Sequence, residues 1–323
     1  FARRTPVGDQ QVRLRQIRDT DLPPDAFSVV MATGIVAVAA DDHGYPWLSI
    51  PLAWLATVVF VGLALGLGIR VAGRPHSAVG EVGDPDVALR LFTSVAACAV
   101  LGVRFVAESW ALWLLGVAAL AAWLFLAPLA IRDVGSRPRN DLREHAHGAW
   151  LLPSVATAGL ATTAADLASH TGSITWLVVG AVVWVLGLLI YCAVASLSGR
   201  RAAASPLNPE MVTPDSWILM GALAIGTLVG YHLLTAAHLL GGNSAITPWV
   251  RPMTFAAWIL ASAWIPVLLY AEIWRVDQRI GSLRYASVWW SAVFPLGMYA
   301  AATAATGSEF RIRALVTVSL VFF

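Results

Sequence analysis

The chain has 323 residues, of which 58% are hydrophobic and only 12% are charged, whereas soluble domains carry roughly 25% charged residues. With a mean hydropathy of +0.72, the composition excludes a soluble protein and predicts an integral membrane protein. The net charge of +2 provides no basic field for nucleic acid. Cys98 and Cys192 both lie inside apolar runs, so neither a disulfide framework nor a metal site is expected.

Ten apolar segments are candidates for helices that cross the bilayer, which takes about 20 residues. In chain order they cover about 25–41, 48–70, 87–106, 110–131, 149–167, 174–197, 216–240, 249–272, 285–306 and a last segment from 311. Because lipid cannot satisfy free backbone polar groups, these segments are predicted to be helices rather than open strands. The sequence therefore predicts an all-α membrane protein with ten transmembrane helices.

The domain organisation follows from these segments. Residues 1–24 are predicted to form a cytoplasmic tail, and residues 25–323 a single transmembrane domain. The last segment, Ile312 to Phe323, reaches only about 18 Å as a helix. We therefore expect the last helix to be incomplete.

All 21 basic residues are arginines, and their placement predicts the orientation. With the N-terminus in the cytoplasm, 17 arginines fall in the tail and the cytoplasmic loops. Only four fall near outer ends: Arg104, Arg251, Arg311 and Arg313. This bias agrees with the positive-inside rule. It predicts a protein of the plasma or inner membrane with both termini in the cytoplasm.

The connections predicted to lie outside are short, for example about 107–109 and 168–173. Short connections join antiparallel neighbours, so the chain is predicted to form five helical hairpins. The odd-numbered helices are richer in small and hydroxyl residues, which suit a wet or helix-facing surface. We therefore expect odd helices inside around a central pore and even helices outside. The candidate pore-lining residues are Thr33, Gly34, Thr93, Ser154, Thr157, Thr227 and Ser291. Ordinary helix packing is the alternative explanation of this composition.

Ionisable residues in the predicted spans are few, which favours anions or neutral solutes over cations, since cation pathways need buried carboxylates. Arg104 is a candidate for anion attraction, or alternatively a terminal arginine that reaches the interface. His232 and His238 do not share a helix face, so each is expected to be a packing or interfacial histidine. Asp41 and Asp42 are expected to be solvated, with a vestibule as the alternative.

Two prolines, Pro153 and Pro295, are predicted to lie in the middle of helices, where the loss of a hydrogen bond produces a kink. Phe294 directly precedes Pro295 among small residues. A bulky aromatic side chain in such surroundings can close a path by steric blocking or dewetting. Ordinary packing is the alternative role for Phe294.

Three segments resemble the tellurite-resistance/C4-dicarboxylate transporter family, which includes fungal malate and sulfite transporters and the plant slow anion channels. They are Pro24–Phe27 with Val30–Gly34, Asn208–Pro209 with Pro214–Ala222, and Trp289–Leu296. The resemblance implies a homotrimer whose subunits each enclose a pore blocked by a phenylalanine. It places this pore gate at Phe294 and Pro295.

The functional prediction is therefore transport of small anions, namely C4-dicarboxylate, chloride, nitrate or sulfite, through a central pore with an aromatic gate. A proton-coupled carrier of dicarboxylates such as malate is the first alternative, with His232, His238 or Arg104 as the titratable candidates. A membrane-embedded enzyme is a second alternative, but it would need a convergent His, Asp or Cys cluster that the spacing does not supply. Hence no enzyme activity, no catalytic residue and no cofactor are expected.

Overall fold

The computed structural model describes residues 23–73, 85–136, 148–204, 213–241, 245–278 and 289–323. The regular structure in these ranges is entirely helical, with ten α-helices and two short 3-10 helices. The α-helices are α2 (Ser28–Asp42), α3 (Pro46–Gly73), α5 (Pro85–Arg104), α6 (Ser109–Ser136), α8 (Leu152–Thr171), α9 (Ile174–Ala204), α10 (Ile218–Leu239), α11 (Thr247–Gln278), α12 (Trp290–Glu309) and α13 (Arg313–Phe322). The all-helical prediction is confirmed for the described residues, and each predicted span overlaps one of these helices, although α3, α6, α9 and α11 extend beyond their predicted bounds.

Seven of the described helices are long and apolar enough to cross a membrane: α3, α5, α6, α8, α9, α10 and α11. Among the other three, α2 has 15 residues and α13 has 10. Nearly all of the predicted tail, the motif residues Asn208 and Pro209, and several arginine-bearing loops lie outside the described residues.

Burial divides the helices into two sets. The buried share of the most apolar stretch is 89% in α8, 78% in α10 and 67% in α5, against 28% in α9, 22% in α11, 17% in α6 and 11% in α3. Most residues of α2 and α12 are buried as well. We call α2, α5, α8, α10 and α12 the buried helices, and α3, α6, α9 and α11 the exposed helices. The exposed helices present large apolar side chains such as Trp54 and Val182, a surface that suits lipid rather than water.

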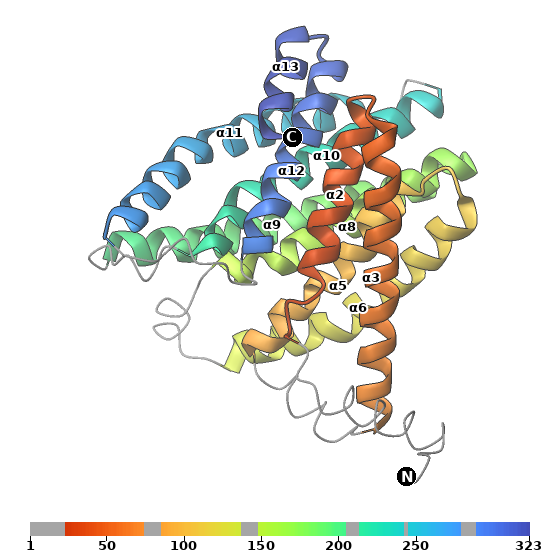
Figure 1. Cartoon of the computed structure of the whole chain (residues 1–323). Coiled ribbons are helices and arrows are strands. Elements are labelled where there is room, and N and C mark those ends of the chain that lie inside the picture. Colours follow the sequence, from red (N-terminus) through yellow and green to blue (C-terminus); the bar gives the residue numbers. More distant parts are fainter. Residues whose placement is uncertain (1–22, 74–84, 137–147, 205–212, 242–244, 279–288) are drawn as a thin grey trace, which may run out of the picture.

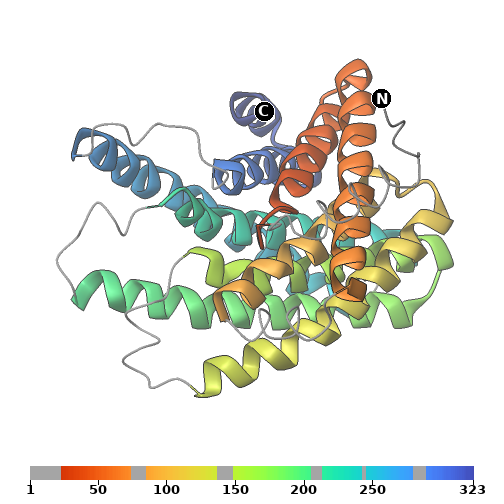
Figure 2. The same cartoon turned by 60° about the horizontal axis from the view of Figure 1, so that its bottom comes forward.

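The buried helices close into a ring. Helix α2 packs against α5, α5 against α8, α8 against α10, α10 against α12, and α12 against α2. Each buried helix also packs against the helix that follows it in the chain. Figures 1 and 2 show the C-terminal helix α13 beside α12 and the long exposed helices around the others.

Glycines set the spacing of this ring. A Cβ atom on Gly34 would lie 2.8 Å from Val100 Cγ1, and one on Gly159 would lie 2.7 Å from Ala99 Cβ. Both contacts are closer than packed carbon atoms allow, so only glycine fits where α5 meets α2 and α8. Small residues that let backbones approach are a common basis of helix association in membranes.

One proline prediction is wrong. Pro295 lies within α12, as expected. Pro153, however, stands in the first turn of α8, directly after the 3-10 helix Gly148–Leu151. The first amides of a helix have no partner in the helix, so proline there costs no hydrogen bond and makes no kink.

Candidate permeation path

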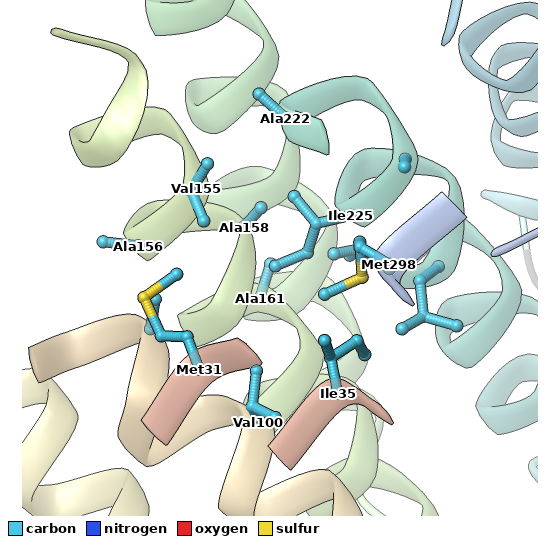
Figure 3. Close-up of a cluster of buried hydrophobic side chains, with 14 of the residues drawn as sticks. Met31, Ile35, Val100, Val155, Ala156, Ala158, Ala161, Ala222, Ile225 and Met298 are labelled. Atoms are coloured by element: carbon cyan, nitrogen blue, oxygen red, sulfur yellow. The ribbon is translucent and has the colours of Figure 1, made fainter. Parts of the chain in front are cut away.

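Apolar side chains from all five buried helices meet on one axis. Figure 3 shows Met31 and Ile35 of α2, Val100 of α5, Val155, Ala156, Ala158 and Ala161 of α8, Ala222 and Ile225 of α10, and Met298 of α12. These side chains gather in one cluster between the five helices. At this level the axis is filled by hydrocarbon.

A small space of about 10 Å³ lies on this axis. Its lining comes from every buried helix and consists of Ile35, Val38, Ala99, Val100, Val103, Gly159, Thr162, Ile225, Leu228 and Met298. We call it the constriction. A volume of about 10–15 Å³ holds a single water molecule, and Thr162 is the one hydroxyl residue in this lining. The constriction is therefore too narrow and too apolar for a hydrated ion.

A cavity of about 420 Å³ lies at the C-terminal ends of the buried helices. Its lining consists of Val38, Asp41, Asp42, Val103, Arg104, Val106, Ala107, Leu228, Tyr231, His232, Ala304, Ala305 and Ser308. We call it the mouth cavity. Val38, Val103 and Leu228 line both the mouth cavity and the constriction. The two spaces thus lie in series along the axis of the ring.

Charged groups concentrate around the mouth cavity. Arg104 lies 3.8 Å from Asp41, and the two side chains are 17% and 55% exposed, respectively. The Nε atom of Arg104 is buried and has no hydrogen-bond partner. Asp42 is exposed on the cavity wall. Asp41 and Asp42 are therefore exposed, as expected, and they also line the mouth cavity, as the vestibule alternative predicts.

A buried ion pair joins two helices beside this cavity. The Nδ1 atom of His232 on α10 lies 2.5 Å from Oδ1 of Asp166 on α8. Asp166 is 5% exposed. Asp166 is not among the residues that line the mouth cavity. His232 holds α10 against α8, as a packing histidine would, but through an acid that the sequence did not single out. An ionisable residue inside a predicted span is a functional candidate by default, and that signal could have identified Asp166.

Phe294 is buried in the ring. It is 2% exposed and stands four residues before Met298 on α12, which places both on one face of the helix, roughly 6 Å apart along its axis. Phe294 therefore lies one turn beyond the constriction, on the side away from the mouth cavity. Its neighbour Val293 is 37% exposed.

Pro295 packs closely on Gly221 of α10. A Cβ atom on Gly221 would lie 2.8 Å from Pro295 Cβ. Pro295, the second predicted gate residue, thus lies at the contact between α10 and α12. The first turn of α12 also contains Ser291, which is partly buried.

The hydroxyl groups of four predicted lining residues, Ser154, Thr157, Thr93 and Thr227, are bound to backbone or to exposed helices. Ser154 Oγ donates to the carbonyl oxygen of Gly187 on α9 at 2.8 Å. Thr157 Oγ1 accepts a 3.0 Å hydrogen bond from Trp123 Nε1 on α6. Thr93 and Thr227 donate to carbonyl oxygens of their own helices. Thr33 is buried, and Gly34 faces Val100. The pore-lining role of these residues stays a prediction.

The chain resembles known membrane proteins over most of its length. Residues 21–323 match the profile of a family described as "Voltage-dependent anion channel". An uncharacterized transporter of Methanocaldococcus jannaschii is 22% identical over 86% of this chain and 82% of its own length. A sulfite efflux pump of Arthroderma benhamiae is 23% identical over 89% of this chain and 82% of its own length.

A shorter match has higher identity. An uncharacterized membrane protein of Mycobacterium tuberculosis is 37% identical over 121 residues, which are 35% of this chain and 56% of that protein. The chain thus spans little more than half the length of this mycobacterial relative. The broader matches, together with the family profile, confirm the resemblance that the three sequence motifs predict.

Proposed function

Because this chain belongs to the voltage-dependent anion channel family, we propose that it conducts small anions along the axis of the buried helices, with Phe294 as the gate. The observation that carries the proposal is that the mouth cavity and the constriction share Val38, Val103 and Leu228 and so lie in series. Phe294, which is buried and four residues before Met298 of the constriction, is proposed to continue this series. Anion transport as the general activity agrees with the family and with the sulfite efflux pump relative.

In this proposal the ring consists of five helical hairpins, each with a buried first helix and an exposed second helix. The contacts of each buried helix with its successor support this arrangement. The exposed helices meet lipid or neighbouring subunits, and the resemblance to the family suggests a homotrimer. The arginine distribution supports an orientation in the cell membrane with both termini in the cytoplasm.

The gate has a simple physical basis. An anion loses most of its hydration shell in a space of about 10 Å³, and apolar walls offer little compensation, so such a constriction blocks ions by dewetting. The Phe294 ring adds a second apolar barrier one turn farther along α12. Removal of the ring or rotation of α12 would lower that barrier. Thr33, Gly34, Thr93, Ser154, Thr157, Thr227 and Ser291 are proposed to line the opened path.

Small inorganic anions are the favoured substrates. Chloride, nitrate and sulfite need a smaller opening than a C4-dicarboxylate, and a relative is named a sulfite efflux pump. Arg104 is proposed to attract them, since its side chain lies in the wall of the mouth cavity. The second candidate is a proton-coupled dicarboxylate carrier. The titratable His232–Asp166 pair is the observation that favours it.

The test is an anion flux assay in proteoliposomes with wild type, Phe294→Ala and Val293→Ala. Phe294→Ala should raise the flux of nitrate and chloride severalfold, because it removes a buried apolar barrier. Val293→Ala alters the adjacent, partly exposed residue and should leave the flux unchanged. Equal flux in folded wild type and Phe294→Ala would reject the gate.

The same assay separates the two candidate functions. Malate and sulfite are compared with nitrate, with and without a pH gradient. Uphill accumulation of malate driven by the gradient would favour the carrier. Downhill flux of nitrate without a gradient supports the channel.

A further inference from the structure

Two basic side chains of the mouth cavity are mostly shielded from water. The side chain of His232 is 17% exposed, and so is that of Arg104. They come from α10 and α5 and line the same cavity of about 420 Å³. Charges that are partly buried interact more strongly with an ion than solvated charges do, because water and salt screen them less.

Arg104 has unused capacity to bind an anion. Its ion-pair partner Asp41 lies at 3.8 Å, well beyond the roughly 2.7–2.9 Å of a charge-assisted hydrogen bond. The Asp41 side chain is 55% exposed, so water can solvate it when an anion takes its place. The buried Nε atom of Arg104 also has no partner.

His232 is held in one orientation by Asp166. Its Nδ1–H donates to Oδ1 of Asp166 at 2.5 Å, and the other carboxylate oxygen, Oδ2, is buried without a partner. A carboxylate that accepts from one imidazole nitrogen stabilises the protonated ring, in which both nitrogens are donors. Since Asp166 uses Nδ1, Nε2 is the nitrogen that remains for a ligand.

We infer that the mouth cavity binds a small inorganic anion between Arg104 and the protonated imidazole of His232, and that Asp166 acts as the positioning residue that keeps the proton on His232. The inference rests on the proposed anion transport and names the residues that select the ion. The occupied site carries an anion and a proton together, so conduction follows the protonation of one histidine.

Other ionisable groups at this end of the ring have other surroundings. Asp42 and Tyr231 line the cavity as well, and desolvation by the surrounding protein raises the pKa of Asp42 to about 6, so Asp42 is a second group that titrates in the range of a pH assay. Arg251 pairs with Glu309 at 3.7 Å. His43 lies 3.1 Å from Ser319, and burial lowers the pKa of His43. His170 and His238 are exposed and do not line the cavity.

Nitrate flux as a function of pH tests the inference, with the same pH on both sides of the vesicle. Nitrate does not titrate in this range, so a pH dependence reports protons on the protein. Wild-type flux should be severalfold higher at low pH than at high pH, because protonation gives His232 the positive charge that holds the anion. His238→Gln, a matched change at an exposed position of the same helix, should keep the wild-type profile.

Three variants give distinct results. His232→Gln should give low flux that does not respond to pH. His232→Lys should keep the flux high across the range. Asp166→Asn preserves shape but removes the charge that favours the protonated ring, so the fall in flux should move to lower pH.

The failures are distinguishable. If wild type conducts nitrate and both Asp166→Asn and His232→Gln keep the wild-type pH profile, the inference is overturned. The proposed function then stays intact. Absence of protein-dependent nitrate flux at every pH, in wild type and in Phe294→Ala, would overturn the proposed function itself. The isosteric Asp166→Asn variant keeps the test decisive if His232→Gln does not fold.

Discussion

The indole nitrogen of Trp184 donates a 2.8 Å hydrogen bond to the carbonyl oxygen of Gly226. Trp184 lies on the exposed helix α9 but is itself 1% exposed, and Gly226 lies on the buried helix α10. The exposed helix α9 packs against two buried helices, α8 and α10. The bond links α9 to α10. Trp123 on α6 makes a comparable bond to Thr157 on α8. Trp184 and Trp123 therefore anchor exposed helices to buried helices.

We expect Trp184→Phe to lower the thermal stability of the purified protein slightly. The ring still fills the site, but one hydrogen bond is lost, which costs about 0.6 kcal/mol on average inside membrane proteins. The midpoint of heat-induced aggregation in detergent measures the effect. Trp54→Phe removes an indole that is 61% exposed and should leave the midpoint unchanged; an equal loss in both variants would contradict the anchoring role.

We expect Gly159→Ala to destabilise the ring. The added methyl group would lie 2.7 Å from Ala99 Cβ, and neither α8 nor α5 has a flexible side chain at this contact that could move aside. Overpacking of this kind costs about 1–3 kcal/mol. The readout is the same melting midpoint. Gly62→Ala is the control, because nothing lies within 4 Å of its new Cβ, and alanine favours a helix. If both changes had the same effect, close contact would not be the cause.

We expect Met298→Ala to raise nitrate flux, since Met298 contributes to the constriction of about 10 Å³. If Met298 and Phe294 form two barriers in series, the double variant should conduct more than the product of the two single effects predicts. Met253→Ala, at a residue that is 38% exposed on α11, should not change the flux. A Met298→Ala protein with wild-type flux would mean that the constriction does not limit conduction.

We expect Arg104→Ala to reduce nitrate flux more at low than at high ionic strength. Long-range attraction acts over about 30 Å at 0.01 M salt but only about 3 Å at 1 M. Arg313→Ala removes an exposed arginine of α13 and should have a smaller effect at either salt concentration. A reduction by Arg104→Ala that does not depend on salt would exclude long-range attraction and leave the direct contact with the anion inferred above, or packing, as the role of Arg104.

The ten helices follow from the sequence because apolar runs of membrane length have few alternatives in lipid. The motif Trp289–Leu296 also suffices to select Phe294, which the structure places inside the ring at 2% exposure. The hydroxyls of Ser154 and Thr157 are a different case. Composition marks them as polar positions in a span. Only the packing of α6 and α9 determines that Thr157 binds Trp123 and that Ser154 binds Gly187.

The sequence by itself thus determined the membrane class, the helices and the family, since hydropathy and short motifs are local properties of the chain. Tertiary structure alone decided which polar groups meet. Asp166 and His232 are 66 residues apart and lie 2.5 Å from each other because α8 packs against α10. No periodicity within either helix encodes that contact, and the charge of the mouth cavity depends on it.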